Sequence, residues 1–376
     1  MSRLSKISNA AFVALLLMQT SAQGIEAPKP ATPPEPEAAE PPAQITPTDE
    51  TQFQVVLQRV STFRNFRGLG VSAEAIDQLS RGEADKAVAS LSALAAQGNK
   101  SADIALVRIQ HWCNTVSSAR LPDTQAQIAK LPKEFSPERA ARVAGVMKAE
   151  AEFMPRAKAG CSKARFDFGG IEARLRKAAD AGDAASTTEL SQFARDPAKR
   201  EAMLQSAVAK NYGPAMYISA TNLLVAVQRG ETTENVSKIR ELLKTAGRTL
   251  PRAKLDLANC MALGCDGHPA DARTAMAFGL DAARDGEPTA FLSMVRMPWG
   301  RQMPRTQLLA WQYFGDRLNE AGCMGDAYVL TSLGFAQSIP SLEKNQPAEI
   351  IDSAKSQAES FWKESGERAK KENGCG

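Results

Sequence analysis

The chain has few of the residues that metal and redox sites require. Its 376 residues include only two histidines, His111 and His268, and its cysteines form no CxxC pair. Protein zinc sites use closely spaced Cys and His ligands, so neither zinc nor a dithiol redox centre is expected. A Gly-x-Ser-x-Gly elbow, a phosphate-binding loop and a zinc-protease helix motif are also missing. We therefore expect no catalytic residue, no metal and no cofactor.

Strand-forming patterns are also scarce. Aromatic residues make up 6% of the chain, and β-branched clusters with alternating apolar residues are rare. Alanine, leucine, arginine, lysine and glutamate dominate, and all of them favour helices. The composition therefore predicts an all-α fold.

The N-terminus carries the features of an export signal. Arg3 and Lys6 precede an apolar run over 10–18, and the small residues Thr20, Ser21 and Ala22 follow as a cleavage site. The run is much shorter than the roughly 20 residues that a membrane span needs. We expect residues 1–22 to be a signal peptide, which predicts a periplasmic or secreted protein with no stable membrane span after cleavage. An uncleaved short anchor is the alternative.

A proline-rich segment follows the signal. Eight of the 21 prolines lie between Pro28 and Pro47, mixed with glutamates and alanines that leave little to bury. Residues 23–50 are therefore predicted to be a disordered Pro/Glu/Ala linker. This segment has six acids and one lysine, a net charge of −5, and the signal carries +2. Because the whole chain has a net charge of +4, residues 51–376 carry +7. That excess permits acidic partners, whereas the export signal and the absence of dense basic runs argue against nucleic acid.

The rest of the chain repeats a helix–glycine–helix pattern. Apolar residues recur at steps of three and four on both sides of a glycine, as in a helical hairpin. Ala253, Ala290 and Ala327 are spaced 37 residues apart, in the range of helix-turn-helix repeats. Gly182 and Gly213 are only 31 residues apart, so that unit is either shortened or misplaced. The turn glycines assigned from the sequence are Gly98, Gly182, Gly213, Gly286 and Gly322.

One copy of the pattern resembles a known repeat. It consists of Leu257, Ala258, Leu263, Gly264, Gly267, Asp271, Ala275, Ala282, Ala283, Gly286 and Ala290. This copy resembles a Sel-one-like repeat, a relative of the tetratricopeptide repeat. The resemblance implies an α/α superhelical solenoid of antiparallel helix pairs over 82–336, with a poorly matching, irregular segment near 121–159. It also implies a scaffold that binds other proteins, but it assigns a binding role to no particular residue of this chain.

Solenoids need capping elements at their ends. Residues 51–81, with Phe63 and Phe66, are predicted to form N-terminal capping helices. Residues 337–376 are predicted to form a C-terminal capping helix and tail, with the helix over 348–371.

An even number of cysteines in an exported chain indicates disulfides. The closest pair, Cys260 and Cys265, is our first choice, because a bridge there would clamp a helix end to the loop at Gly264. The six cysteines are Cys113, Cys161, Cys260, Cys265, Cys323 and Cys375.

The other four cysteines can form two disulfides that join more distant parts of the chain. A Cys113–Cys161 bridge would close the segment 121–159 at its base. A Cys323–Cys375 bridge would tie the C-terminal tail to the last repeat.

One surface cluster is a candidate partner-binding site. Arg296, Trp299, Arg301 and Arg305 lie close together in the sequence, and arginine and tryptophan are common anchors of binding interfaces. Such a loop could bind an acidic peptide or an anionic envelope polymer. The structural alternative is that Trp311, on the following helix, belongs to the core and that the arginines only expose the loop to solvent without binding a partner.

The sequence therefore favours an exported helical-repeat scaffold that binds another envelope protein, peptide or anionic polymer. Two alternatives remain open. One is a cell-wall or β-lactam amide hydrolase of the cysteine-rich repeat type, which the resemblance leaves possible; the other is a purely structural spacer.

Overall fold

A computed structural model describes most of the chain after the predicted linker. The described residues are 73–118, 124–130, 137–231, 236–265, 268–324 and 328–373. The predicted signal peptide 1–22, the linker 23–50 and the first part of the N-terminal cap, with Phe63 and Phe66, lie outside these residues.

All regular structure in the described residues is helical, so the predicted all-α class is confirmed. The elements are α3 Ala73–Ser80, α4 Ala84–Ala96, α5 Lys100–Ser118, α6 Thr124–Ile128, α8 Pro137–Lys163, α9 Phe168–Asp180, α10 Ala184–Phe193, α11 Pro197–Ala209, α12 Gly213–Gln228, α13 Val236–Ala246, α14 Pro251–Leu263, α15 Ala272–Arg284, α16 Pro288–Arg296, the 3-10 helix η2 Gly300–Gln302, α17 Arg305–Glu320, α18 Tyr328–Glu343 and α19 Ala348–Asn373.

The hairpin on which the resemblance was based forms as the sequence indicates. Gly264 ends α14 with a φ of 71°, in the left-handed region that glycine adopts without steric cost. Asp271 begins α15, where its side chain accepts a hydrogen bond from the backbone N–H of Thr274. Ala275 and Ala283 are fully buried, so small side chains allow α14 and α15 to approach closely.

One turn assignment was wrong. Gly213 is the first residue of α12 rather than a turn residue. The turn residue between α11 and α12 is Asn211, with a φ of 57°. Asparagine tolerates the left-handed region better than most residues, so it replaces glycine here. The short spacing between Gly182 and Gly213 therefore came from a misplaced turn.

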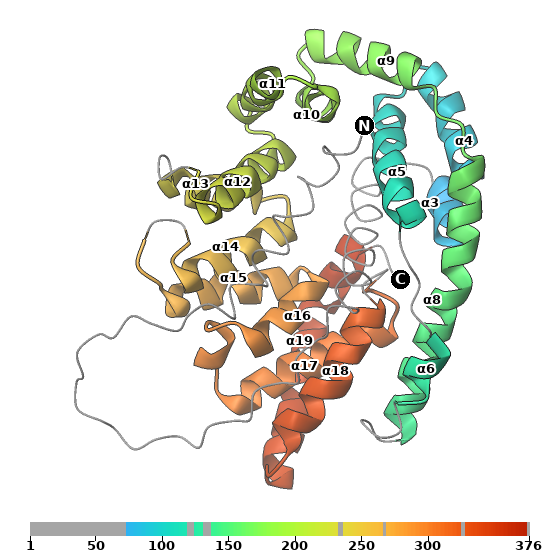
Figure 1. The fold of residues 1–376 in the computed structure, drawn as a ribbon. Helices are drawn as coiled ribbons and strands as arrows, with labels where there is room; N and C mark the ends of the chain where they lie inside the picture. The colour runs from blue at the N-terminus through green and yellow to red at the C-terminus, as the bar shows by residue number, and fades with distance from the viewer. Residues whose placement is uncertain are drawn as a thin grey trace.

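Successive helices pack against their neighbours along a curved, superhelical path. Figure 1 shows this path from α4 and α5 through α9, α12 and α14 to α17. From α9 to α18 each α-helix contacts the next one along the chain, and α5 contacts α9 at the start of this path. The predicted superhelical solenoid is therefore present.

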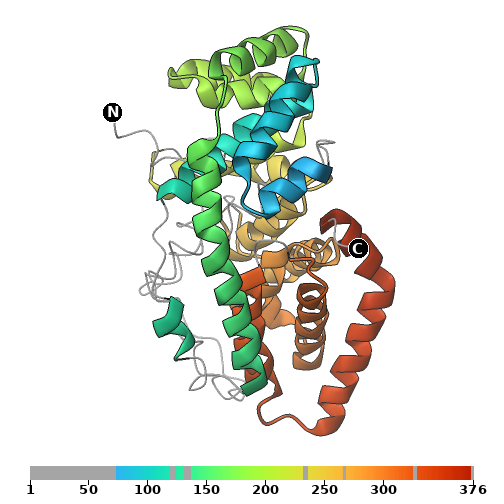
Figure 2. The same ribbon diagram turned by 90° about the vertical axis from the view of Figure 1, so that its right-hand side faces the viewer.

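The segment expected to be irregular is mostly one long helix. Within 121–159 lie α6 and most of α8, a helix of 27 residues. α8 runs alongside several other helices, and its neighbours are α4, α5, α6 and α18 (Figure 2). α8 departs from the repeat pattern because it is one long helix that contacts both the first described helices and α18.

The core is divided into two main parts. One lies among α3, α4, α5, α8 and α9 and includes Trp112. The larger one extends from α12 to α19 and includes Phe291, Trp311 and Phe314. The helix expected over 348–371 is α19, which contacts α17 and α15. The expected start of the C-terminal cap, residue 337, falls inside α18 rather than between helices.

Candidate partner-binding site

The candidate cluster lies at the connection from α16 through η2 to α17, and Trp299 within it is buried. Its indole Nε1 donates a 2.9 Å hydrogen bond to the side-chain oxygen of Asn259 on α14. A Cβ added at Gly279 on α15 would lie 2.5 Å from the indole ring, so the ring occupies the space that this glycine leaves. The prediction of Trp299 as a surface anchor was therefore wrong, because the indole joins α14, α15 and the connection.

Arg305 also has a structural role, contrary to its assignment as a partner-binding residue. Its guanidinium donates hydrogen bonds to the backbone carbonyls of Ser341 and Leu342, at 2.8 and 3.0 Å. These carbonyls lie in the last turn of α18, where helix C-termini leave acceptors without intrahelical donors. The start of α17 is thereby fixed to the end of α18.

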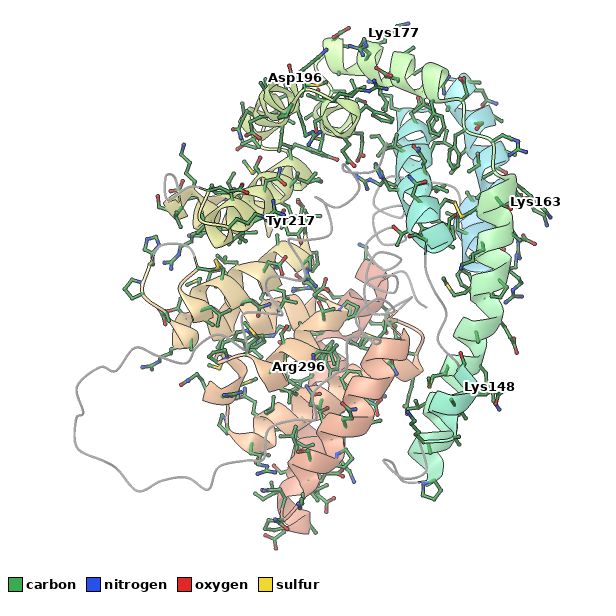
Figure 3. All side chains as sticks on the ribbon, viewed as in Figure 1. Lys148, Lys163, Lys177, Asp196, Tyr217 and Arg296 are labelled. Carbon is green, nitrogen blue, oxygen red and sulfur yellow. A yellow bond between two sulfur atoms is a disulfide. The ribbon has the colours of Figure 1, made fainter. Side chains whose placement is uncertain are left out.

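Arg296 and Arg301 lie on either side of Trp299, and neither has an ion pair or hydrogen bond from its side chain within the described part of the chain. Arg301 is exposed in η2. Arg296 lies in the last turn of α16 (Figure 3). It is half-buried there, and this burial lowers the pKa of its guanidinium. A half-buried cation without a carboxylate nearby favours an anion. Of the four residues predicted from the sequence, Arg296 and Arg301 are therefore the two that stay candidates for binding a partner.

Trp311 belongs to the core, as the structural alternative held. It is 1% exposed, and its ring stacks on Phe361 of α19 with 4.3 Å between ring centroids. Arg284 lies over the same indole at 5.7 Å. Trp311 therefore contributes to the packing of α17 against α19 rather than to a surface.

Two disulfides have both of their cysteines within the described residues, and both follow the expected pairing. Cys113 of α5 is bonded to Cys161 of α8, with Cα atoms 5.3 Å apart. Cys260 and Cys265 clamp the end of α14 across Gly264. The first bridge closes the segment that contains α6 and most of α8, and the second holds the end of α14, as the sequence indicated.

The third pairing is described only in part. Cys323, after α17, is also disulfide-bonded. Its expected partner, Cys375, lies outside the described residues.

A buried polar network, not predicted from the sequence, connects the alternate helices α12, α14 and α16. Tyr217 of α12 donates a 2.7 Å hydrogen bond to a carboxylate oxygen of Asp256 on α14. Arg252, one turn earlier on α14, pairs with the same carboxylate at 3.2 Å and donates to the hydroxyl of Thr289 on α16 at 2.6 Å. Burial raises the pKa of Asp256, and Arg252 opposes that rise. The four-residue spacing of Arg252 and Asp256 could have indicated that the two side chains pair. Their other partners, Tyr217 and Thr289, lie far away in the sequence and could not be predicted from it.

A second charged cluster joins α14 and α15 to α19. Lys254 donates hydrogen bonds to both Asp281 and Asp285, with 2.7 Å to Asp285, and Arg368 of α19 also pairs with Asp285. Burial raises the pKa of Asp281, but Lys254 and Arg368 outweigh this effect and lower it overall. The cluster fixes the C-terminal helix against the repeats.

Neither histidine belongs to a metal-binding group in the described residues. Cys113, two residues after His111, is bonded to Cys161 and cannot act as a thiolate nucleophile. His268 is exposed between α14 and α15. Within the described ranges no group of three or more His, Cys, Asp or Glu side chains is arranged to hold a metal ion. No helix in the part of the chain that the structure describes is long and apolar enough to cross a membrane.

Comparisons with known proteins give little further identification. No protein-family model matches the chain, and no curated protein matches it. Among solved structures, it is similar to a protective antigen present in uropathogenic Escherichia coli strains that displays an SLR fold. The two share 13% sequence identity and a TM-score of 0.31, over 76% of this chain and 73% of the antigen. A likeness of this degree carries no argument about what the chain binds.

Proposed function

We propose that this chain is an exported helical-repeat scaffold that binds an acidic envelope protein or peptide. The observation that carries the proposal is the pair Arg296 and Arg301, two cations at one connection with no ion pair among the described residues. Carboxylates of a partner would supply the charge-assisted hydrogen bonds that the two guanidinium groups do not form within the chain.

Three other features support this proposal. The superhelical stack presents an extended surface of the kind that repeat proteins use for binding. The disulfides at Cys113 and Cys260 suit an oxidising compartment outside the cytoplasm. The +7 charge of residues 51–376 would attract an acidic partner over longer distances.

The test is a crosslinking pull-down from envelope extract with the purified chain and two charge-reversal variants, Arg296→Glu and Arg301→Glu. We expect both variants to lose the captured partner. Arg248→Glu, which changes an exposed arginine between α13 and α14, is the matched control and should capture the partner as wild type does.

Two other results would contradict the proposal. If both variants and the control capture the same partner equally, these arginines do not bind it. If the lost ligand is a glycan polymer instead of a protein or peptide, the charge argument holds but the partner class is wrong.

A further inference from the structure

Two large apolar side chains stay exposed in the part of the chain that the structure describes, Phe168 at 44% and Leu263 at 39%. Phe168 is the first residue of α9, and its ring stacks on that of Phe166 with 5.7 Å between ring centroids. Phe166 is half-buried and packs against the core of the N-terminal helices. This aromatic pair, Phe166 and Phe168, therefore rests on the core from one side and presents an exposed ring at the connection between α8 and α9.

The connection is fixed at both of its ends. Cys161, in the last turn of α8, is bonded to Cys113 of α5. A Cβ added at Gly160 would lie 2.3 Å from the carbonyl oxygen of Gly82, so the end of α8 touches the turn between α3 and α4 backbone to backbone. After the connection, Ile171 of α9 is only 2% exposed. The aromatic pair is therefore held at the surface before any partner binds, which lowers the ordering cost of binding.

Two cations beside the aromatic pair form no ion pair with a carboxylate among the described side chains. Lys163 is exposed at the end of α8, and Figure 3 shows it on the outer side of the helix. Arg165 is also exposed, and its guanidinium donates a 3.3 Å hydrogen bond to the carbonyl of Ser162. These two cations and the aromatic pair together form what we call the 163–168 surface.

The carboxylates that are nearest in the sequence already have partners of their own. Asp167 accepts a 3.0 Å hydrogen bond from a backbone N–H in the first turn of α9. Glu172 pairs with Arg176 at 2.6 Å. Because neither carboxylate forms an ion pair with Lys163 or Arg165, these two cations are available to an anion from outside the chain.

We propose that the 163–168 surface docks on a phospholipid membrane with anionic headgroups. Peripheral membrane binding combines apolar side chains that enter the interface with cations that are attracted to anionic lipids, and this surface supplies both. It lies at the outer edge of the superhelix, where α8 turns into α9 (Figure 1). A lipid surface accepts a projecting ring without a matching pocket, whereas a protein partner needs a complementary shape.

This contact is independent of the proposed partner site. Figure 3 shows Lys163 well apart from Arg296, so the two surfaces can be occupied separately. The export signal predicted at the N-terminus would bring the folded chain to such a membrane. A scaffold that is held on a membrane by one surface can present its other surface to a partner.

Vesicle sedimentation tests the proposal. The chain is used with its disulfides formed and without residues 1–22, because the apolar run of the predicted signal would itself bind lipid. Vesicles of phosphatidylcholine mixed with phosphatidylglycerol are compared with vesicles of phosphatidylcholine alone. We expect a bound fraction about fivefold higher on the anionic vesicles. Added salt should remove this difference, because it screens the attraction between the cations and the headgroups.

Two variants with matched controls assign the binding to this surface. Phe168→Ser should lower the fraction bound to anionic vesicles about threefold, whereas Leu263→Ser, at the other exposed apolar side chain, should bind as the wild type does. Arg165→Glu should lower the bound fraction about fivefold. Arg248→Glu makes the same charge change at an exposed residue elsewhere and should lower it much less.

Phe168→Trp provides a second measurement, which decides if Phe168→Ser fails to fold. Fluorescence of the added indole should shift to shorter wavelength on anionic vesicles and stay unchanged on neutral ones. The proposal is overturned if the chain binds both kinds of vesicle equally or neither, or if the Phe168 and Leu263 variants lose binding to the same extent. If polyglutamate binds instead of vesicles and Arg165→Glu weakens that binding, the surface serves an acidic protein and the membrane proposal is wrong.

Discussion

The indole of Trp299 donates a hydrogen bond to Asn259, forty residues earlier in the chain, and this bond ties the loop after α16 to α14. Trp299 also fills the space beside Gly279 on α15. A residue that looks like a surface anchor in the sequence is therefore a contact between repeats. This changes how its variants should be interpreted, because loss of partner capture in Trp299→Ala would report unfolding rather than binding.

We predict that Trp299→Ala lowers the free energy of unfolding by about 3–5 kcal/mol, the usual cost of removing a large buried aromatic side chain. Trp299→Phe should cost less, about 1–3 kcal/mol, because it keeps most of the apolar contact but leaves the buried Asn259 oxygen without its donor. Urea denaturation followed by circular dichroism measures both. Equal stability of Trp299→Ala and wild type would show that the indole is not buried as described.

We predict opposite effects for two glycine substitutions within α8. Gly160→Ala should destabilise the protein by about 1–3 kcal/mol, because the new methyl group would overlap the backbone of the turn at Gly82. Gly145→Ala should stabilise it by about 0.5–1 kcal/mol, because alanine favours the helix and nothing lies near the new methyl group. Thermal melts of the two variants check the signs, and a stabilising Gly160→Ala would disprove the close backbone contact.

We predict that the two described disulfides differ in their contribution to stability. Removing the Cys113–Cys161 bridge with paired serines should cost about 4 kcal/mol, because its 48-residue separation closes a large loop in the unfolded chain. Removing Cys260–Cys265, with a separation of 5, should cost only about 2 kcal/mol. Denaturant titrations of the two double variants provide the comparison. A larger loss from the shorter loop would contradict the loop-entropy explanation.

We predict an acid-dependent loss of stability that involves Asp281. Burial alone would raise its pKa, but Lys254 and Arg368 lower it below the ordinary 3.8. A lowered pKa in the folded state stabilises the fold above about pH 4, and this contribution is lost as the pH falls through the folded pKa. The free energy of unfolding can be measured between pH 2.5 and 7 for both proteins. Toward the acid end, it should fall less steeply in Asp281→Asn than in the wild type. Parallel curves for the two proteins would argue against the pairing.

Local features of the fold could be predicted from the sequence, whereas contacts between distant residues could not. The turn at Gly264 and the cap at Asp271 depend on neighbouring residues, so their pattern is visible in the chain. Asn211 was missed because a second residue type tolerates the same backbone conformation. The roles of Trp299 and Arg305 depend on Asn259 and on the end of α18, and no local spacing reports these contacts.

The contact between Gly82 and Gly160 also bears on how the chain acquires its structure. The two backbones touch, although their positions differ by 78 residues. The first described hairpin therefore cannot reach its final packing until α8 has been synthesised, and contacts this far apart in sequence slow folding. When the chain is synthesised from its N-terminus, its first helices can be fixed in place only after Gly160 and the neighbouring Cys161 have been added.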